Sequence, residues 1–238
     1  MTTRRWKPLE SNPEALKTYA VSLGLSPEYS FHDVLSTEEW AIEMLPSPPL
    51  SFLFLYPITP SQESYHQSEA NKKEDTTDKK GGLVEVRQNI GNACGTIAIL
   101  HAVANLAKST DPGIVPDGAS WLGKFKSASS GGTAESMAAI VDGSEELERM
   151  HKESASSEEN STATGTDDKV NEHFVAFLQT SSGVWEMDGR RPEGPGIFRG
   201  PVPEGGSFAG VSMEAVKGYM ERDPTNYKFN IIALCKDV

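Results

Sequence analysis

The stretch "RQNIGNACGTIAILHAVANLA", which runs from Arg87 to Ala107, places a cysteine at the beginning of an apolar helical segment. The helix predicted from Asn92 to about Lys108 is apolar on nearly every face, which indicates a central, buried helix. Cys94 lies in or near its first turn, where unpaired backbone N–H groups and the helix dipole favour a negatively charged sulfur. The thiol is therefore either a small core side chain or a nucleophile.

Composition narrows the class of protein. The chain has 238 residues, of which 37% are hydrophobic and 24% charged, as in soluble globular proteins. Its longest apolar run, Pro49–Ile58, is too short to span a bilayer, and the N-terminus lacks the apolar stretch of a secretory signal. Cys94 and Cys235 alone do not make a disulfide framework, so we expect a reduced protein of the cytoplasm, with the nucleus as an alternative.

The net charge of −12 limits the partners. An acidic chain is a poor binder of phosphate backbones and can attract a basic protein, although solubility alone explains the same acidity equally well. We expect neither nucleic acid nor a membrane as a partner, and we expect a monomer.

Helical and strand patterns occur along the whole chain. In the first helix, Asn12 or Ser11 is the predicted cap, and Gly24 ends the apolar spacing. Helices are predicted over Ser11–Ser26, after Ser36 and over Gly143–Ala155, and strands over Ser51–Ile58, Leu83–Gln88, His173–Leu178, Val184–Gly189 and Tyr227–Val238.

Two polar stretches, Ser61–Gly82 and Ser156–Lys169, have no apolar face and are predicted to be long loops. The part from Ser109 to Ile140 is rich in Gly, Ser and Pro and yields no clear prediction. Because neither polar stretch separates self-sufficient halves, we expect one domain over residues 1–238.

A catalytic Cys94 needs help, because a free thiol is only about 3% ionised at pH 7. Lowering its pKa by two units requires roughly 2.7 kcal/mol, more than a helix dipole usually supplies, so a histidine partner is expected. Without such a partner a cysteine is more often a buried structural residue. We interpret Cys235, in the last predicted strand, as structural.

One histidine has a suitable setting. His101 lies about 10 Å along the helix from Cys94, too far to reach the thiol. If Gln179–Ser182 is a turn, His173 and Asp188 face each other across a hairpin at about 5 Å. The carboxylate would then fix the tautomer of the imidazole and stabilise the imidazolium. The other interpretation is a surface pair at a hairpin end. The histidines not chosen are His32, His66, His101 and His151.

Gln88 completes the candidate site. A tetrahedral oxyanion needs hydrogen-bond donors, which the Gln88 carboxamide and the backbone N–H of Cys94 can supply. A glutamine at this spacing is weak evidence alone. Together with Cys94, His173 and Asp188 it describes a coherent Cys–His–Asp site for acyl transfer.

With these residues in place, "QNIGNACGTIAILHAVAN" and "NEHFVAFLQTSSGVWEMDGRRPEGP" resemble the ubiquitin carboxyl-terminal hydrolase family of thiol proteases, and its small members in particular. The resemblance extends to the segments Arg4–Pro13, Phe31–Ser36, Leu53–Thr59 and Phe229–Leu234. It implies a papain-like α+β fold, with a mostly antiparallel central sheet flanked by helices and a knotted chain.

The resemblance also implies roles for the site residues. Cys94 becomes the nucleophile, His173 the general base and then acid, Asp188 the residue that orients His173, and Gln88 part of the oxyanion hole. No metal or cofactor is needed. The implied substrates are amides, esters and thioesters at the C-terminal glycine of ubiquitin or of a close ubiquitin-like modifier, which places the protein in the ubiquitin conjugation pathway.

Ser156–Lys169 falls where the family carries a crossover loop above the active site. Fourteen residues extend at most roughly 50 Å, which admits an unstructured tail but no folded protein, so small or unstructured leaving groups are expected. Candidate contacts to ubiquitin's basic surface are Glu159, Asp167 and Asp168, although charges of a solvated loop are the favoured interpretation of these residues. Lys7 is a polar departure from the family's N-terminal motif.

Two other functions compete with hydrolysis. The first is a catalytically weak protein that binds or stabilises ubiquitin, which the intact constellation disfavours. The second is a papain relative, whose signature C-G-[SA]-C-[WY] and histidine about 130–150 residues downstream are both absent.

Overall fold

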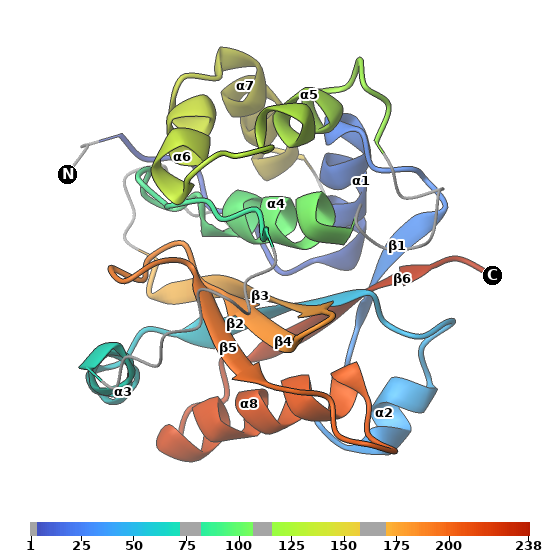
Figure 1. Cartoon of the computed structure of the whole chain (residues 1–238), viewed down its shortest axis with the longest axis vertical. Coiled ribbons are helices and arrows are strands. Elements are labelled where there is room, and N and C mark those ends of the chain that lie inside the picture. Colours follow the sequence, from blue (N-terminus) through green and yellow to red (C-terminus); the bar gives the residue numbers. More distant parts are fainter. Residues whose placement is uncertain (1–3, 72–81, 107–115, 158–169) are drawn as a thin grey trace.

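A computed structural model describes residues 4–71, 82–106, 116–157 and 170–238. A sheet with the strand order β1-β6-β2-β3-β4-β5 forms the middle layer, and all of its neighbouring strands are antiparallel. Helices cover both faces (Figure 1). The predicted α+β architecture, an antiparallel sheet between helices, is confirmed.

The strands come from distant parts of the chain. The last strand, β6, lies between β1 and β2, so the C-terminal segment closes the sheet between two early segments. The pairing of β6 with β1 and the pairing of β6 with β2 therefore both join residues that are far apart in the sequence. The strands are β1 (Tyr29–Asp33), β2 (Ser51–Pro57), β3 (Glu172–Thr180), β4 (Gly183–Met187), β5 (Gly196–Gly200) and β6 (Asn230–Lys236).

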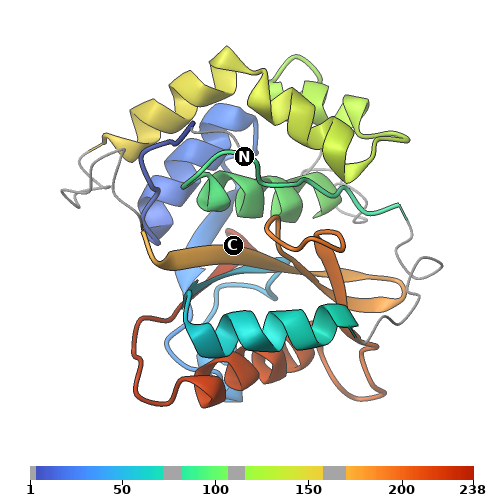
Figure 2. The same cartoon turned by 90° about the vertical axis from the view of Figure 1, so that its left-hand side faces the viewer.

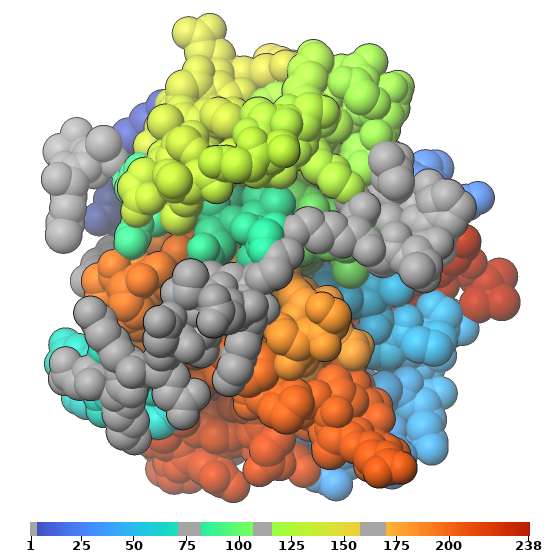
Figure 3. Space-filling view, in the orientation of Figure 1, coloured from blue at the N-terminus to red at the C-terminus, as the bar shows by residue number. Residues whose placement is uncertain are grey.

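The helices form two unequal layers. On one face of the sheet lie α1, α4, α5, α6 and α7, and on the other lies α8 with α2 at its end, a division that the space-filling view repeats (Figures 1 and 3). The bounds are α1 (Pro13–Leu23), α2 (Glu39–Glu43), α3 (Pro60–Asn71), α4 (Cys94–Leu106), α5 (Trp121–Ala128), α6 (Ala134–Asp142), α7 (Glu145–Ala155) and α8 (Phe208–Arg222). No helix in these described ranges is long and apolar enough to cross a membrane.

Strand β2 shows how the sheet joins two cores. Leu53 packs into the core beneath α4, whereas Phe52 and Phe54 pack into the core that contains α8. Successive side chains of a strand point to opposite faces, so a strand buried on both faces is apolar throughout. This explains the uninterrupted apolar run of the sequence.

The first and the central helix confirm their predictions. Asn12 caps α1 by accepting the N–H groups of Glu14 and Ala15, and Gly24 ends it at φ 120°. A Cβ on Gly24 would lie 2.2 Å from the Ser120 hydroxyl, so only glycine fits there. In α4, every residue after Cys94 is buried.

The predicted loop Ser61–Gly82 is wrong over its first half, because Pro60–Asn71 forms α3. This helix lies beside α8 (Figure 2) and buries polar side chains toward it. Gln62 is buried and donates to the carbonyl of Tyr219 at 2.8 Å, and His66 meets the Tyr219 hydroxyl at 3.2 Å. Because the buried side of α3 carries polar residues, the sequence shows no apolar periodicity that would predict this helix. Residues 72–81 lie outside the described part.

The predicted strand Leu83–Gln88 is also wrong, since this extended segment belongs to no ladder of the sheet. Val84 and Val86 are buried, which accounts for the alternating pattern. Their backbone N–H groups are satisfied by α4 side chains instead: Val84 donates to Asn105 Oδ1 at 2.8 Å and Val86 to His101 Nε2 at 2.9 Å.

Candidate active site

Cys94 is the first residue of α4. The first helical hydrogen bond runs from the N–H of Ile97 to the carbonyl of Ala93 at 3.0 Å, and Asn92 precedes it with φ 61°. Because the helix begins at this residue, Cys94 is partly exposed, whereas the residues from Gly95 to Leu106 are buried. The sulfur therefore lies at an accessible end of a helix whose other described residues are held in the core.

The thiol opens into a groove of about 750 Å³. The N-terminal segment Pro8–Pro13 forms part of its wall, together with residues from β2, β3 and β6. Cys94, His173 and Gln88 all line it. Three of the four residues predicted from the sequence thus share one groove, and Asp188 lies behind His173.

His173 and Asp188 form a buried pair. Nε2 of His173 lies 2.6 Å from Oδ1 of Asp188, and both side chains are almost completely shielded from solvent. Because Nε2 faces Asp188, Nδ1 is the ring atom left for the Cys94 sulfur, with which His173 shares a hydrogen bond. The ring of Tyr56 supports the imidazole from the side, with centroids 5.6 Å apart.

The hairpin that carries this pair differs from its predicted register. The turn is Ser181–Ser182, Thr180 pairs with Gly183, and Ala176 pairs with Met187, so His173 and Asp188 are not directly opposite. The ladder ends before Asp188, and the contact forms diagonally. The shift is two residues, and a shift of two keeps side chains on the same face of a strand, which is why the predicted contact survives.

Charges in the site stabilise one another. Burial lowers the pKa of His173, but the Asp188 carboxylate and the Cys94 sulfur raise it to about 9. Burial raises the pKa of Asp188, and His173 outweighs this effect and holds it well below its usual range. Burial likewise raises the pKa of the Cys94 thiol, whereas His173 and the amides of Phe174 and Gly95 lower it below its ordinary value. The folded site therefore favours a thiolate–imidazolium pair.

Gln88 stands beside this pair. Its backbone N–H donates to the carbonyl of Gly189 at 2.9 Å, and its side-chain Nε2 donates to the carbonyl of Ile90 at 3.1 Å. The carboxamide nitrogen carries two N–H groups, so the second remains for another acceptor. Oε1 of Gln88 is buried and has no hydrogen-bond partner among the described residues.

Gly189 is a site residue that the sequence analysis missed. A Cβ there would lie 2.9 Å from Ile97 Cγ2 and 3.1 Å from the carbonyl of Val86. Only glycine lets the Asp188 turn dock against the segment that contains Gln88. The signal was present in "EMDGRR", where a glycine directly follows the carboxylate.

The other histidines and the second cysteine have structural settings. Burial lowers the pKa of His101 to about 4, and its Nε2 accepts the N–H of Val86. His151 bonds the Thr96 hydroxyl at 2.8 Å and the carbonyl of Lys7 at 2.7 Å. Burial raises the pKa of Cys235 to about 11, which agrees with its interpretation as a core thiol.

The candidate ubiquitin contacts Glu159, Asp167 and Asp168 lie outside the described residues, as does most of Ser156–Lys169. In the ranges that the structure describes, no cluster of His, Cys, Asp and Glu side chains could hold a metal ion.

An antiparallel sheet packed on a central helix, with a thiol at the helix start and a histidine on the adjoining strand, defines a protein of the cysteine peptidase class. The chain belongs to ubiquitin carboxyl-terminal hydrolase family 1, whose family model matches residues 6–221.

Similar proteins cover nearly the whole chain. A ubiquitin carboxyl-terminal hydrolase of Drosophila melanogaster is 33% identical over 231 residues, which is 96% of each protein. Isozyme L1 of Macaca fascicularis is 33% identical over 236 residues, covering 97% of this chain and 98% of the relative. Among solved structures, the catalytic domain of Trichinella spiralis UCH37, bound to ubiquitin vinyl methyl ester, matches with a TM-score of 0.76 at 22% identity, over 98% of this chain and 96% of that one.

Proposed function

We propose that the chain hydrolyses amide, ester and thioester bonds at the C-terminal glycine of ubiquitin, with Cys94 as nucleophile. The observation that carries this proposal is the buried His173–Asp188 pair, 2.6 Å apart, next to a thiol at the start of a helix. A relative of the same fold has been captured with a ubiquitin vinyl methyl ester, which supports ubiquitin as the partner. A close ubiquitin-like modifier is the other substrate that this site could take.

The mechanism follows from the charges. The Cys94 thiolate attacks the carbonyl carbon, and the negative charge moves to the carbonyl oxygen. The second N–H of Gln88 and the backbone N–H of Cys94 would stabilise this oxyanion. The His173 imidazolium then protonates the leaving group, which departs and leaves a thioester on Cys94. His173, now neutral, takes a proton from water, the resulting hydroxide cleaves the thioester, and Asp188 keeps the ring oriented throughout.

The groove suits a basic, extended tail. Glu10, Asp33 and Glu172 line it, against two basic residues, Arg5 and Arg190, and the chain as a whole carries a net charge of −12. Opposite charge on a partner speeds its encounter and sets its orientation. The acidic groove therefore favours a ubiquitin tail that carries positive charge.

Small or unstructured leaving groups are the expected substrates, because the chain segment that precedes the His173 strand can reach only a limited distance. We also expect one catalytic unit over residues 1–238, a monomer, and a cytoplasmic or nuclear place in ubiquitin conjugation. The free thiols Cys94 and Cys235 suit a reducing compartment.

A second function, binding of ubiquitin with weak turnover, is favoured by one observation. The Gln88 carboxamide already donates one N–H to the carbonyl of Ile90, so only its second N–H is left for an oxyanion. Binding without product release would support this alternative.

A fluorogenic amide of ubiquitin's C-terminus separates the two functions. We expect the wild type to release the dye, Cys94→Ala to release none, and Cys235→Ala to behave as the wild type because that thiol lies in the core. Gln88→Ala should lower turnover by about 100-fold. A wild type that binds ubiquitin but releases no dye would exclude hydrolysis. Ubiquitin joined to a second folded ubiquitin should be cleaved far more slowly than the dye.

A further inference from the structure

The carboxylate behind His173 has a second charged neighbour. Oδ1 of Asp188 accepts from His173 and from the backbone N–H of Arg190 at 2.9 Å. Oδ2 faces Nε of Arg191 at 3.5 Å. The guanidinium of Arg191 is 2% exposed, which is unusual for an arginine and requires a reason.

Arg191 ties the Asp188 turn to α3. One terminal nitrogen donates to Glu69 at 2.8 Å, and the other donates to the carbonyl of His66 at 3.3 Å. Glu69 also binds Arg199 of β5. The helix that the sequence analysis mistook for a loop therefore supplies the anchor of this arginine.

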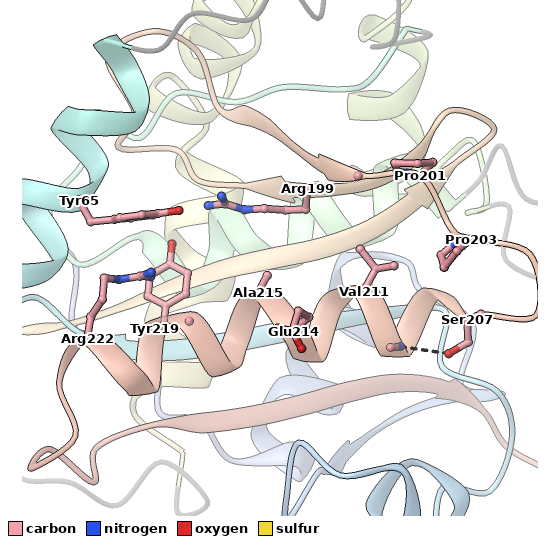
Figure 4. Close-up of a pocket in the computed structure, with 14 residues that line it drawn as sticks. Tyr65, Arg199, Pro201, Pro203, Ser207, Val211, Glu214, Ala215, Tyr219 and Arg222 are labelled. Carbon is pink, nitrogen blue, oxygen red and sulfur yellow. Dashed lines mark hydrogen bonds between the residues drawn. The ribbon is translucent and has the colours of Figure 1, made fainter.

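Beyond Glu69 the ion pairs continue across the sheet. Arg199 reaches Glu186 of β4 at 2.7 Å, and the Tyr219 hydroxyl of α8 donates to Glu186 at 2.6 Å. Figure 4 shows the side-chain ends of Tyr65 and Arg199 pointing toward each other with Tyr219 below them, where this end of the network borders a cavity of about 610 Å³. The groove that holds Cys94 lies at the other end, so the network spans the interior between the two.

The carboxylates of this network outnumber its arginines. Arg191 and Arg199 oppose Glu69, Glu186 and Asp188, and the partly exposed Glu193 lies 3.7 Å from Arg191. An imidazolium at His173 adds a favourable positive charge beside Asp188. Burial raises the pKa of Glu69, but Arg199 and Arg191 outweigh this effect and hold it at about 2, so the carboxylate stays charged. Buried ions are stable only in such paired arrangements.

The sheet holds the backbone of Asp188 but not the direction of its carboxylate. The β3–β4 ladder ends at Met187, the N–H of Asp188 donates to the carbonyl of Pro195 at 2.8 Å, and the N–H of Arg191 donates to the Asp188 carbonyl at 3.2 Å. We propose that Arg191, anchored on Glu69, is a positioning residue that keeps the Asp188 carboxylate aimed at His173. This inference deepens the proposed function and rests on it for the role of His173.

Arg191→Met tests the positioning role. Because small misplacements of a catalytic group are costly, we expect kcat on the ubiquitin amide to fall about 10- to 100-fold. KM should stay near the wild-type value, since Arg191 does not line the groove. Arg149→Met is the matched control, because Arg149 is exposed on α7 and pairs with Glu153 at 2.8 Å.

A pH profile gives a readout that a merely structural role would not move. We would follow iodoacetamide alkylation of the Cys94 peptide by mass spectrometry. If the Asp188 carboxylate turns away from His173, it no longer stabilises the imidazolium, and the Cys94 thiolate loses its positively charged partner. The pKa of the thiol then rises, so the pH of half-maximal alkylation should increase by about one unit in Arg191→Met.

The titratable groups around Cys94 and His173 should not distort this pH profile. His66 and His101 have pKa values lowered by burial to about 4, and the tyrosines are raised by burial above their usual range, so none of them titrates between roughly pH 5 and 8. The groups that face the pair from the surrounding elements are Tyr56 of β2, His66 of α3, Cys94 and His101 of α4, Glu186 of β4, Arg190 and Arg191 of the turn, and Tyr219 of α8.

Two further variants keep the proposal testable if Arg191→Met does not fold. Arg191→Lys keeps the charge and should recover part of kcat. The pair Glu69→Gln with Arg191→Met removes one acid and one base together, and its loss of kcat should not exceed that of Arg191→Met. A folded Arg191→Met or double variant with wild-type kcat and alkylation profile would overturn the positioning role. Failure of the wild type to cleave ubiquitin would instead reject the proposed function, and alkylation would still report on Arg191.

Discussion

On one face of the sheet, α4 buries every residue from Gly95 to Leu106. On the other, α3 packs beside α8 through Gln62 and His66, and its Glu69 binds Arg191, which faces Asp188. The first region is held by the transfer of apolar surface from water, which is strong and non-directional. The second is held by polar contacts, which are directional and costly when left incomplete.

The apolar and the polar region also contribute differently to the candidate site. The apolar region holds α4, and with it Cys94, in a fixed position, because closely packed protein interiors deform little. The polar region sets the charge and direction of the Asp188–His173 pair. Changes in the apolar region should therefore mainly reduce stability, and changes next to Asp188 in the polar region should mainly reduce turnover of the folded protein.

The largest effect is expected at the polar end. Asp188→Asn should lower kcat by about 10³- to 10⁴-fold, because the amide can hold the imidazole in the wrong tautomer and cannot stabilise the imidazolium. Initial rates on the ubiquitin amide measure this effect. Asp117→Asn, at an exposed position in the loop before α5, is the control. Asp188→Asn with at least a tenth of wild-type kcat would break the assignment of turnover to this region.

The opposite result is expected in the apolar region. Leu100→Ala removes a fully buried side chain of α4 and should lower the free energy of unfolding by about 2–5 kcal/mol. Gln62→Ala leaves the Tyr219 carbonyl without its donor and should cost about 1–3 kcal/mol. Urea unfolding compares the two. Equal kcat per folded molecule for Leu100→Ala and the wild type would sharpen the division, and a collapse of kcat would contradict it.

Gly189, where the two regions meet, should show an intermediate effect. Gly189→Ala places a methyl group against Ile97 and the Val86 carbonyl and should cost roughly 1–3 kcal/mol through overpacking. The matched control is Gly118→Ala, where nothing lies within 4 Å of the added carbon. If both variants unfold at the same urea concentration, the close approach at Gly189 does not constrain the site.

A further effect, which changes no residue, is a dependence of stability on pH. Burial lowers the pKa of His101 and His151 to about 4, so the folded protein binds fewer protons than the unfolded chain below the unfolded value of about 6.5. Stability from these groups is present above that value and is lost as the pH falls toward 4, at up to about 1.4 kcal/mol per pH unit for each histidine. Unfolding in urea at several pH values should show the slope, and His101→Gln should reduce it.

Much of the candidate site could be predicted because its signals are local. A cysteine at the start of an apolar helix places the thiol from "NACGT" alone, and the alternation of a hairpin places His173 and Asp188 on one face even when the register is two residues off. Missed elements had weak patterns. The strand Gly196–Gly200 is short and glycine-bounded, and α8 contains glycines within its turns.

Patterns along the chain were enough to predict α1 with its cap, the buried helix that begins at Cys94, and the residues proposed for the candidate site, since these depend on neighbours along the chain and on apolar periodicity. Long-range contacts were needed to establish that α3 is a helix, that the Leu83–Gln88 segment bonds to His101 and Asn105, and that Arg191 lies behind Asp188. Those features depend on polar partners far apart in sequence, and periodicity records which side chains leave water but not which polar groups they meet.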